Sequence, residues 1–150
     1  MTHNDNDNDN HSDKAASSTD AGGPAVRWLA APEEHDYPAA AAYLSLLAGP
    51  DVVEATIAAL RTSTVVHGKA KDILRASRLP LLDTDNVHVR ADLHKIVKRI
   101  ALSPILAVRG DLTADLPLVV ADGYHRVCAS YHTDENTDIP LVLTPLPHKA

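Results

Sequence analysis

The sequence predicts a small α+β or α/β protein, in which a mixed sheet with a few helices follows an α-helical N-terminal cap. Three observations lead to this class. Apolar residues recur at helical spacing through the first half of the chain. Residues 104–108 and 116–121 are short apolar runs, typical of strands buried on two faces. Residues 122–126 place a glycine turn between the second run and a helix-like segment.

Residues 1–24 are expected to form a disordered acidic tail. They are an Asn/Asp repeat followed by Ser, Thr, Ala and Gly, a composition that cannot bury surface in a core. Five aspartates against one lysine place four of the six net negative charges of the chain there. His3 and His11 could hold a metal ion, although a solvated tail is the simpler interpretation. Because the remaining residues are close to neutral, a broad attraction to nucleic acid is not indicated.

Residues 25–78 are predicted to form the helical cap. Its first helix is marked by an apolar stripe: Ala40, Tyr43, Leu44 and Leu47. The second helix begins at Pro50, since proline suits a first helical turn. The third is expected at about residues 68–77. It would carry a small basic cluster, interpreted as a solvated face: His67, Lys69 and Lys71.

Residues 79–150 are predicted to form the core that contains the sheet. Residues 83–86 supply capping side chains for an amphipathic helix. The apolar stripe of that helix is Val89, Leu93, Ile96, Val97 and Ile100. The two apolar runs follow as strands, the glycine turn leads into a further helix, and residues 139–143 form the last strand.

The turn Asp122-Gly123-Tyr124-His125-Arg126 is the most informative stretch of the chain. A turn from a strand into a helix aims the free N–H groups of the helix at its mouth, where they and the helix dipole favour an anion. His125 and Arg126 lie off the apolar stripe of this helix, so core packing does not explain them. Positive side chains are unfavourable at a helix N-terminus unless an anion is present, which makes phosphate the expected ligand.

The other residues of the turn have alternative interpretations. Asp122 could cap the helix, orient His125 or hold a metal ion, and these roles can coexist. Gly123 is expected to act through its backbone, by a conformation closed to other residues or by admitting a ligand to the main chain. Tyr124 lies on the apolar stripe with Cys128, so packing is its first interpretation, with ligand contact the second.

The order of these parts over about residues 79–145 resembles the ParB/sulfiredoxin superfamily of nucleotide-binding domains. The run Asp-Gly-Tyr-His-Arg is most similar to the branch that contains a free-serine kinase. The resemblance implies ATP or CTP bound with its phosphates on Gly123, Tyr124, His125 and Arg126. It also places the segment around Asp85 near the ligand, so Asp85 becomes a candidate for a catalytic carboxylate or a Mg²⁺ ligand, with helix capping as the alternative.

Two departures from the superfamily limit the expected activity. Sulfiredoxins have a reactive cysteine immediately before His-Arg, where this chain has Tyr124. The free-serine kinases have an upstream catalytic glutamate, whereas no glutamate lies between Glu54 and Glu135 here. The implied catalytic set is therefore His125 with Asp122 or Asp85, and the implied Mg²⁺ ligands are the same two aspartates.

The expected function is binding of the nucleotide phosphates, with phosphotransfer to a small hydroxyl-bearing acceptor, or nucleotide hydrolysis, as the reaction. A non-catalytic module that responds to a nucleotide and acts through a protein partner is the alternative. A nuclease is less favoured, because the folded part is near neutral and aromatic residues are scarce. The base, the acceptor and the oligomeric state are left open by the sequence.

The sequence also predicts a cytoplasmic location. The single cysteine, Cys128, allows no disulfide within the chain and fits a reducing compartment. The polar N-terminus does not resemble a signal peptide. No apolar run approaches the roughly 20 residues of a membrane-spanning helix.

Overall fold

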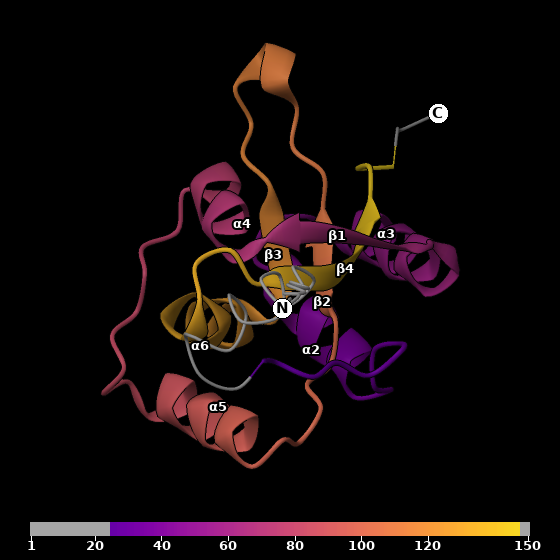
Figure 1. The fold of residues 1–150 in the computed structure, drawn as a ribbon. Coiled ribbons are helices and arrows are strands. Elements are labelled where there is room, and N and C mark those ends of the chain that lie inside the picture. Colours follow the sequence, from indigo (N-terminus) through magenta and orange to yellow (C-terminus); the bar gives the residue numbers. More distant parts are fainter. Residues whose placement is uncertain (1–24, 148–150) are drawn as a thin grey trace, which may run out of the picture.

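The protein is built on a four-stranded mixed sheet with strand order β1-β4-β2-β3 (Figure 1). The computed structural model describes residues 25–147, so the predicted acidic tail, with His3 and His11, lies outside the described residues. The strands are β1 (Val65–Lys69), β2 (Ile105–Val108), β3 (Val119–Asp122) and β4 (Asp138–Thr144). β4 runs antiparallel to β1 and parallel to β2, and β2 and β3 form an antiparallel pair. The predicted α+β class is confirmed.

Helices cover both faces of the sheet (Figure 1). One face packs against α2 (Asp36–Leu44) and α3 (Pro50–Thr62). The other packs against α4 (Ala70–Ser77) and α6 (Tyr124–Thr133), and α5 (Val87–Val97) lies against α6. The result is a layer of strands between two layers of helices.

The side chains of β2 alternate between the two apolar clusters. Ile105 and Ala107 belong to the cluster with α4, α5 and α6, whereas Leu106 and Val108 belong to the cluster with α2 and α3. All four are buried, which confirms that this apolar run is a strand covered on two faces.

A β-bulge interrupts the pairing of β2 and β3 just before the glycine turn. Leu106 pairs with Asp122 and Ala107 pairs with Val120, so Ala121 is the extra residue of β3. Directly opposed residues on neighbouring strands point to the same face of a sheet. The bulge therefore turns the Asp122 side chain toward the face of the sheet that α2 covers. Leu106 points to the same face.

The segment 25–78 is not purely helical, contrary to the prediction, because it also supplies β1. This strand pairs along its whole length with residues 138–142 of β4. Most of its side chains are exposed, so it lacks the alternating apolar pattern that marks a half-buried strand. His67 and Lys69 consequently lie on a strand, and the third helix begins at Ala70.

Asn86 caps α5 within the segment predicted to supply capping side chains. Its Oδ1 accepts the backbone N–H groups of His88 (2.9 Å) and Val89 (3.1 Å). Asp85, the neighbouring candidate, is exposed and is not the cap. Of the two roles considered for Asp85, helix capping is therefore wrong.

Replacing Asn86 with Ala should lower the free energy of unfolding by about 1 kcal/mol, because two N–H groups of α5 lose their acceptor. Asp85→Ala is the matched control, with an expected loss of only a few tenths of a kcal/mol from the helix dipole. Urea unfolding followed by circular dichroism measures both. Equal losses in the two variants would contradict the assignment of Asn86 as the cap.

Candidate functional site

Gly123 joins β3 to α6 in a conformation that other residues rarely adopt. Its φ is 112°, and it occupies the N-cap position of α6. A Cβ atom at this position would lie 2.4 Å from Cδ1 of Ile105 and 3.0 Å from Nη2 of Arg126. The backbone angle confirms the first of the two roles predicted for Gly123, a conformation closed to other residues. The close packing against Ile105 also requires glycine and was not predicted.

The first turn of α6 has no side-chain cap within residues 25–147. Gly123 offers no side chain at the N-cap position, and Asp122 precedes it. The interpretation of Asp122 as the helix cap is therefore wrong. Because the first N–H groups of a helix have no partner within the helix, those of Tyr124, His125 and Arg126 depend on groups from outside α6.

Asp122 and Arg126 form an ion pair. The Arg126 Nη2 group donates to Oδ2 of Asp122 at 3.0 Å and to the backbone oxygen of Pro104 at 3.3 Å. The Arg126 side chain is only 17% exposed, and its Nη2 group is committed to the ends of β2 and β3. Its Nε is buried and has no acceptor within the described part of the chain.

A second buried acid lies beside this ion pair. Asp36, in the first turn of α2, is 2% exposed, and its Oδ2 accepts the backbone N–H of Glu33 at 2.9 Å. Burial raises the pKa of Asp122, Arg126 opposes that shift, and the neighbouring Asp36 carboxyl adds to it. Sequence reasoning missed Asp36, since α2 is far from the glycine turn along the chain.

His125 is partly exposed and packs against other rings. Its ring centroid lies 4.7 Å from that of His88 on α5 and 5.7 Å from that of Tyr124. Burial lowers the pKa of His125, and His88 and Arg126 lower it further, whereas Asp92 acts in the opposite direction. The lowered pKa favours the neutral ring, which can both donate and accept a hydrogen bond.

Asp92 is the carboxylate that α5 brings near this group. Burial raises its pKa, and the positive charges that oppose the shift are, in decreasing order, Arg126, Lys95, His125 and His88. The sequence contained a signal for Asp92. It lies three residues after Val89 and four before Ile96, so an acid occupies the buried stripe of an amphipathic helix.

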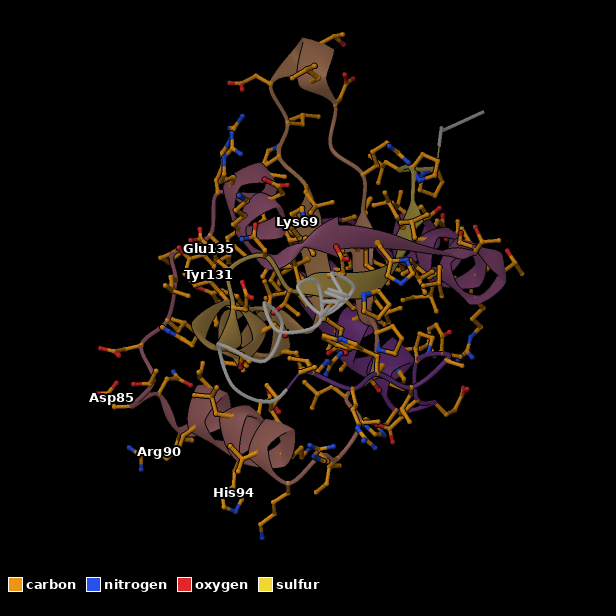
Figure 2. The ribbon with its side chains drawn as sticks, in the orientation of Figure 1. Lys69, Asp85, Arg90, His94, Tyr131 and Glu135 are labelled. Atoms are coloured by element: carbon orange, nitrogen blue, oxygen red, sulfur yellow. The ribbon has the colours of Figure 1, made fainter. Side chains whose placement is uncertain are left out.

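Asp85 lies in the exposed turn before α5, at the outer edge of the molecule (Figure 2). Asp122, by contrast, is held by Arg126 next to α2, so the two predicted Mg²⁺ ligands do not form one cluster. Residues 25–147 contain no group of three His, Cys, Asp or Glu side chains that could hold a metal ion. The donor set therefore does not fit a dedicated Mg²⁺ site.

Tyr124 packs partly against the core and is anchored at its far end. Its hydroxyl donates to the backbone oxygen of Pro80, and its ring belongs to the rim of the cluster that contains Val127 and Cys128. The structure thus brings together Asp122, Gly123, Tyr124, His125 and Arg126, adds Asp36, His88 and Asp92, and leaves Asp85 apart.

Comparisons with models of protein families, with curated proteins and with solved structures found no match to this chain. Within the described residues, no helix combines the length and the apolar character needed to cross a bilayer.

Gly123→Ala should lower the free energy of unfolding by about 2–4 kcal/mol, because the new Cβ meets Ile105 and the backbone angle is unfavourable for alanine. Gly49→Ala is the matched control, since a Cβ at Gly49 meets nothing within 4 Å. Its expected effect is about 0.5–1 kcal/mol, since Gly49 is the N-cap residue of α3 and alanine is less favourable there. Chemical denaturation measures both variants, and an unchanged stability of Gly123→Ala would show that the turn can relax.

Asp92→Asn should become more stable relative to the natural protein as the pH rises above 3.8, the ordinary pKa of aspartate. In the folded state burial raises the Asp92 pKa above 3.8, so folding takes up a proton between the unfolded and folded pKa values. Rising pH in that window therefore lowers the stability of the natural protein, and asparagine removes this contribution. Denaturation across the pH range measures the difference, with the exposed Asp85→Asn as control. A pH-independent difference would contradict the burial of Asp92.

Proposed function

We propose that this protein binds the phosphate groups of a nucleoside di- or triphosphate, of the ATP or CTP type, at the N-terminus of α6. One observation carries the proposal: the first turn of α6 has no side-chain cap within residues 25–147 and carries His125 and Arg126. An uncapped helix N-terminus with basic side chains is unfavourable alone and favourable with an anion.

Each group of the turn has a role in this proposal. In this proposal the backbone N–H groups of Tyr124, His125 and Arg126 donate to phosphate oxygens, and Gly123 supplies the positive φ with which the chain turns into α6. Arg126 contributes positive charge beside the turn, although its Nη2 group stays with Asp122. The neutral ring of His125 donates a hydrogen bond, or takes up a proton when the phosphate charge raises its pKa.

Phosphotransfer to a small hydroxyl-bearing acceptor such as serine extends the proposal. Asp92 is better placed than Asp85 to accept the hydroxyl proton, because it lies near both His125 and Arg126. The acceptor oxygen would form the new bond to the terminal phosphorus as the bond to the bridging oxygen breaks, and the nucleoside diphosphate leaves. Mg²⁺ would accompany the nucleotide phosphates, since Asp85 and Asp122 do not share a site.

A non-catalytic module that responds to a nucleotide is the second candidate, and the Asp122–Arg126 ion pair favours it. A phosphate that competes for Arg126 would weaken the bond to Asp122 at the sheet and alter the contact of Asp122 with α2. A protein partner could read that change. Both candidate functions are compatible with the resemblance to the ParB/sulfiredoxin superfamily. In either case we propose a cytoplasmic location.

Nucleotide binding is tested by thermal unfolding with ATP or CTP, each with and without Mg²⁺. A ligand at about 100 times its Kd should raise the Tm by roughly 5–10 °C. His125→Ala should weaken binding about tenfold, because one hydrogen bond to a charged ligand is lost. His94→Ala is the matched control, since His94 is exposed on the outer side of α5 (Figure 2). Equal shifts in both variants would place the nucleotide elsewhere.

Arg126→Ala is a poor test of this site, because it would leave Asp122 partly buried without its partner and weaken the fold. Phosphorus NMR with ATP and serine then separates the two candidates. A phosphorylated acceptor, or released phosphate, selects the enzyme, and Asp92→Asn should abolish the turnover. Binding without turnover selects the responsive module.

A further inference from the structure

The outer face of α5 carries a series of exposed positive side chains. The inner face of this helix packs into the core through Val89 and Ile96. Figure 2 shows Arg90 and His94 projecting from the opposite side of the helix, away from the rest of the molecule. The exposed basic residues of α5 and of the turn after it are Arg90, His94, Lys95, Lys98 and Arg99.

The chain enters the described part of the fold beside these residues. Trp28 forms a parallel β-bridge with Leu102, and the backbone oxygen of Arg27 accepts the N–H of Leu102 at 2.8 Å. Arg27 is exposed and adds a positive charge next to the segment that follows α5. Arg27 and the five residues above form the basic face. Because the first described residue lies only three positions before the bridge, residues 1–24 join the chain close to this face.

The positive charge of the basic face is not balanced by nearby acids. None of its side chains takes part in an ion pair among residues 25–147. Asp92, the one acid of α5, is partly buried, and Lys95 is the only residue of the face that acts on its pKa. Glu33 accepts from the hydroxyl of Ser103 and lies 4.0 Å from His35. The helix dipole adds only about half a negative charge at the end of α5, so most of the positive charge remains.

Residues 1–24 carry the opposite charge and can reach the whole face. Five aspartates against one lysine give them a net charge of −4. Asp13 lies twelve residues before Ala25, and a chain of that length extends up to about 40 Å. The eleven residues of α5 span only about 16 Å. The exposed acids Asp83 and Asp85 precede α5, so like-charge repulsion directs the acidic segment to the C-terminal half of the helix.

We propose that residues 1–24 bind the basic face of their own chain, with aspartates against Lys95, Lys98 and Arg99. The proposal does not depend on phosphate binding at α6. Because the segment is tethered beside the face, its effective concentration there is on the order of 1 mM. The segment of another copy at about 10 µM is some 100-fold more dilute, so the contact forms within one chain. Other polyanions then reach the face only by displacing the segment.

Carbodiimide cross-linking of the whole 150-residue chain tests the contact. The reagent activates an aspartate carboxyl, and a lysine amine in contact with it forms an amide as the urea leaves. Peptide mass spectrometry should find amides from the aspartates of residues 1–24 to Lys95 or Lys98. Amides to Lys69, an exposed lysine on β1 away from α5, should be about tenfold fewer (Figure 2).

Charge reversal on the face tests its role while both reporter lysines are kept. Arg90→Glu combined with Arg99→Glu should reduce the amides to these lysines about tenfold, since two attractive charges become repulsive. Lys71→Glu combined with Arg109→Glu is the matched control, because it changes the net charge equally on α4 and next to β2. It should leave the amides unchanged, whereas salt at about 1 M should suppress them in the natural protein.

Mixing ¹⁵N-labelled and unlabelled protein identifies the molecule that supplies the acidic segment. Each amide should join two peptides of the same isotope. Mixed pairs at the statistical frequency would place the segment of another copy on the face and overturn the proposal. Equal yields at Lys95 and Lys69, or yields that the reversal of Arg90 and Arg99 does not change, would also overturn it.

Nucleic acid is the competing occupant, because its phosphates would fit the same charges. A single strand of about 20 nucleotides, added at about 0.15 M salt, should fail to bind or should displace the segment, with loss of the amides. Binding to the basic face with the amides undiminished would assign the face to nucleic acid and overturn the proposal. Circular dichroism of each variant verifies its fold before cross-linking.

Discussion

The close packing of the Gly123 backbone against Ile105 is the constraint on which the candidate site depends. Because Gly123 has no side chain, β3 can pass directly into α6 beneath Ile105. Asp122 and Arg126 then lie one helical turn apart and form their ion pair. The β-bulge at Ala121 directs Asp122 toward α2 and Asp36. One short turn therefore ties the end of the sheet to helices on both of its faces.

Burial favours the neutral form of three titratable groups around this turn. It raises the pKa values of Asp92 and Asp122 and lowers that of His125, so each of the three is shifted toward its neutral form. Arg126 is the fixed charge that opposes the shifts of the two acids. An anion at the α6 N-terminus would reverse the balance at His125, because a nearby negative charge favours the imidazolium. The proposed anion binding at this site would thereby be linked to proton uptake.

The sequence predicted the elements whose apolar pattern is local. The buried strands β2 and β4 and the helices α5 and α6 each carry a continuous apolar run or a helical stripe. β1 was missed, because its exposed residues are ordered only by hydrogen bonds to β4, far along the chain. The site shows the same difference between local and long-range signals. Residues 122–126 are consecutive, and the sequence analysis identified them. Asp36 and Asp92 were missed, because only tertiary packing brings them near this turn. Asp85 was wrongly expected near the glycine turn. It directly precedes α5, but it does not lie on the face of α5 that meets α6.

The glycine turn and the hairpin tip, the short 3₁₀ helix Leu112–Ala114 between β2 and β3, lie at opposite ends of the same strand pair. The turn at Gly123 follows the last residue of β3, whereas the hairpin tip precedes the first. β3 is four residues long, which separates the two ends by about 10 Å of extended chain. The turn and the tip share no residue. A phosphate bound at the N-terminus of α6, as proposed, would therefore leave the hairpin tip uncovered.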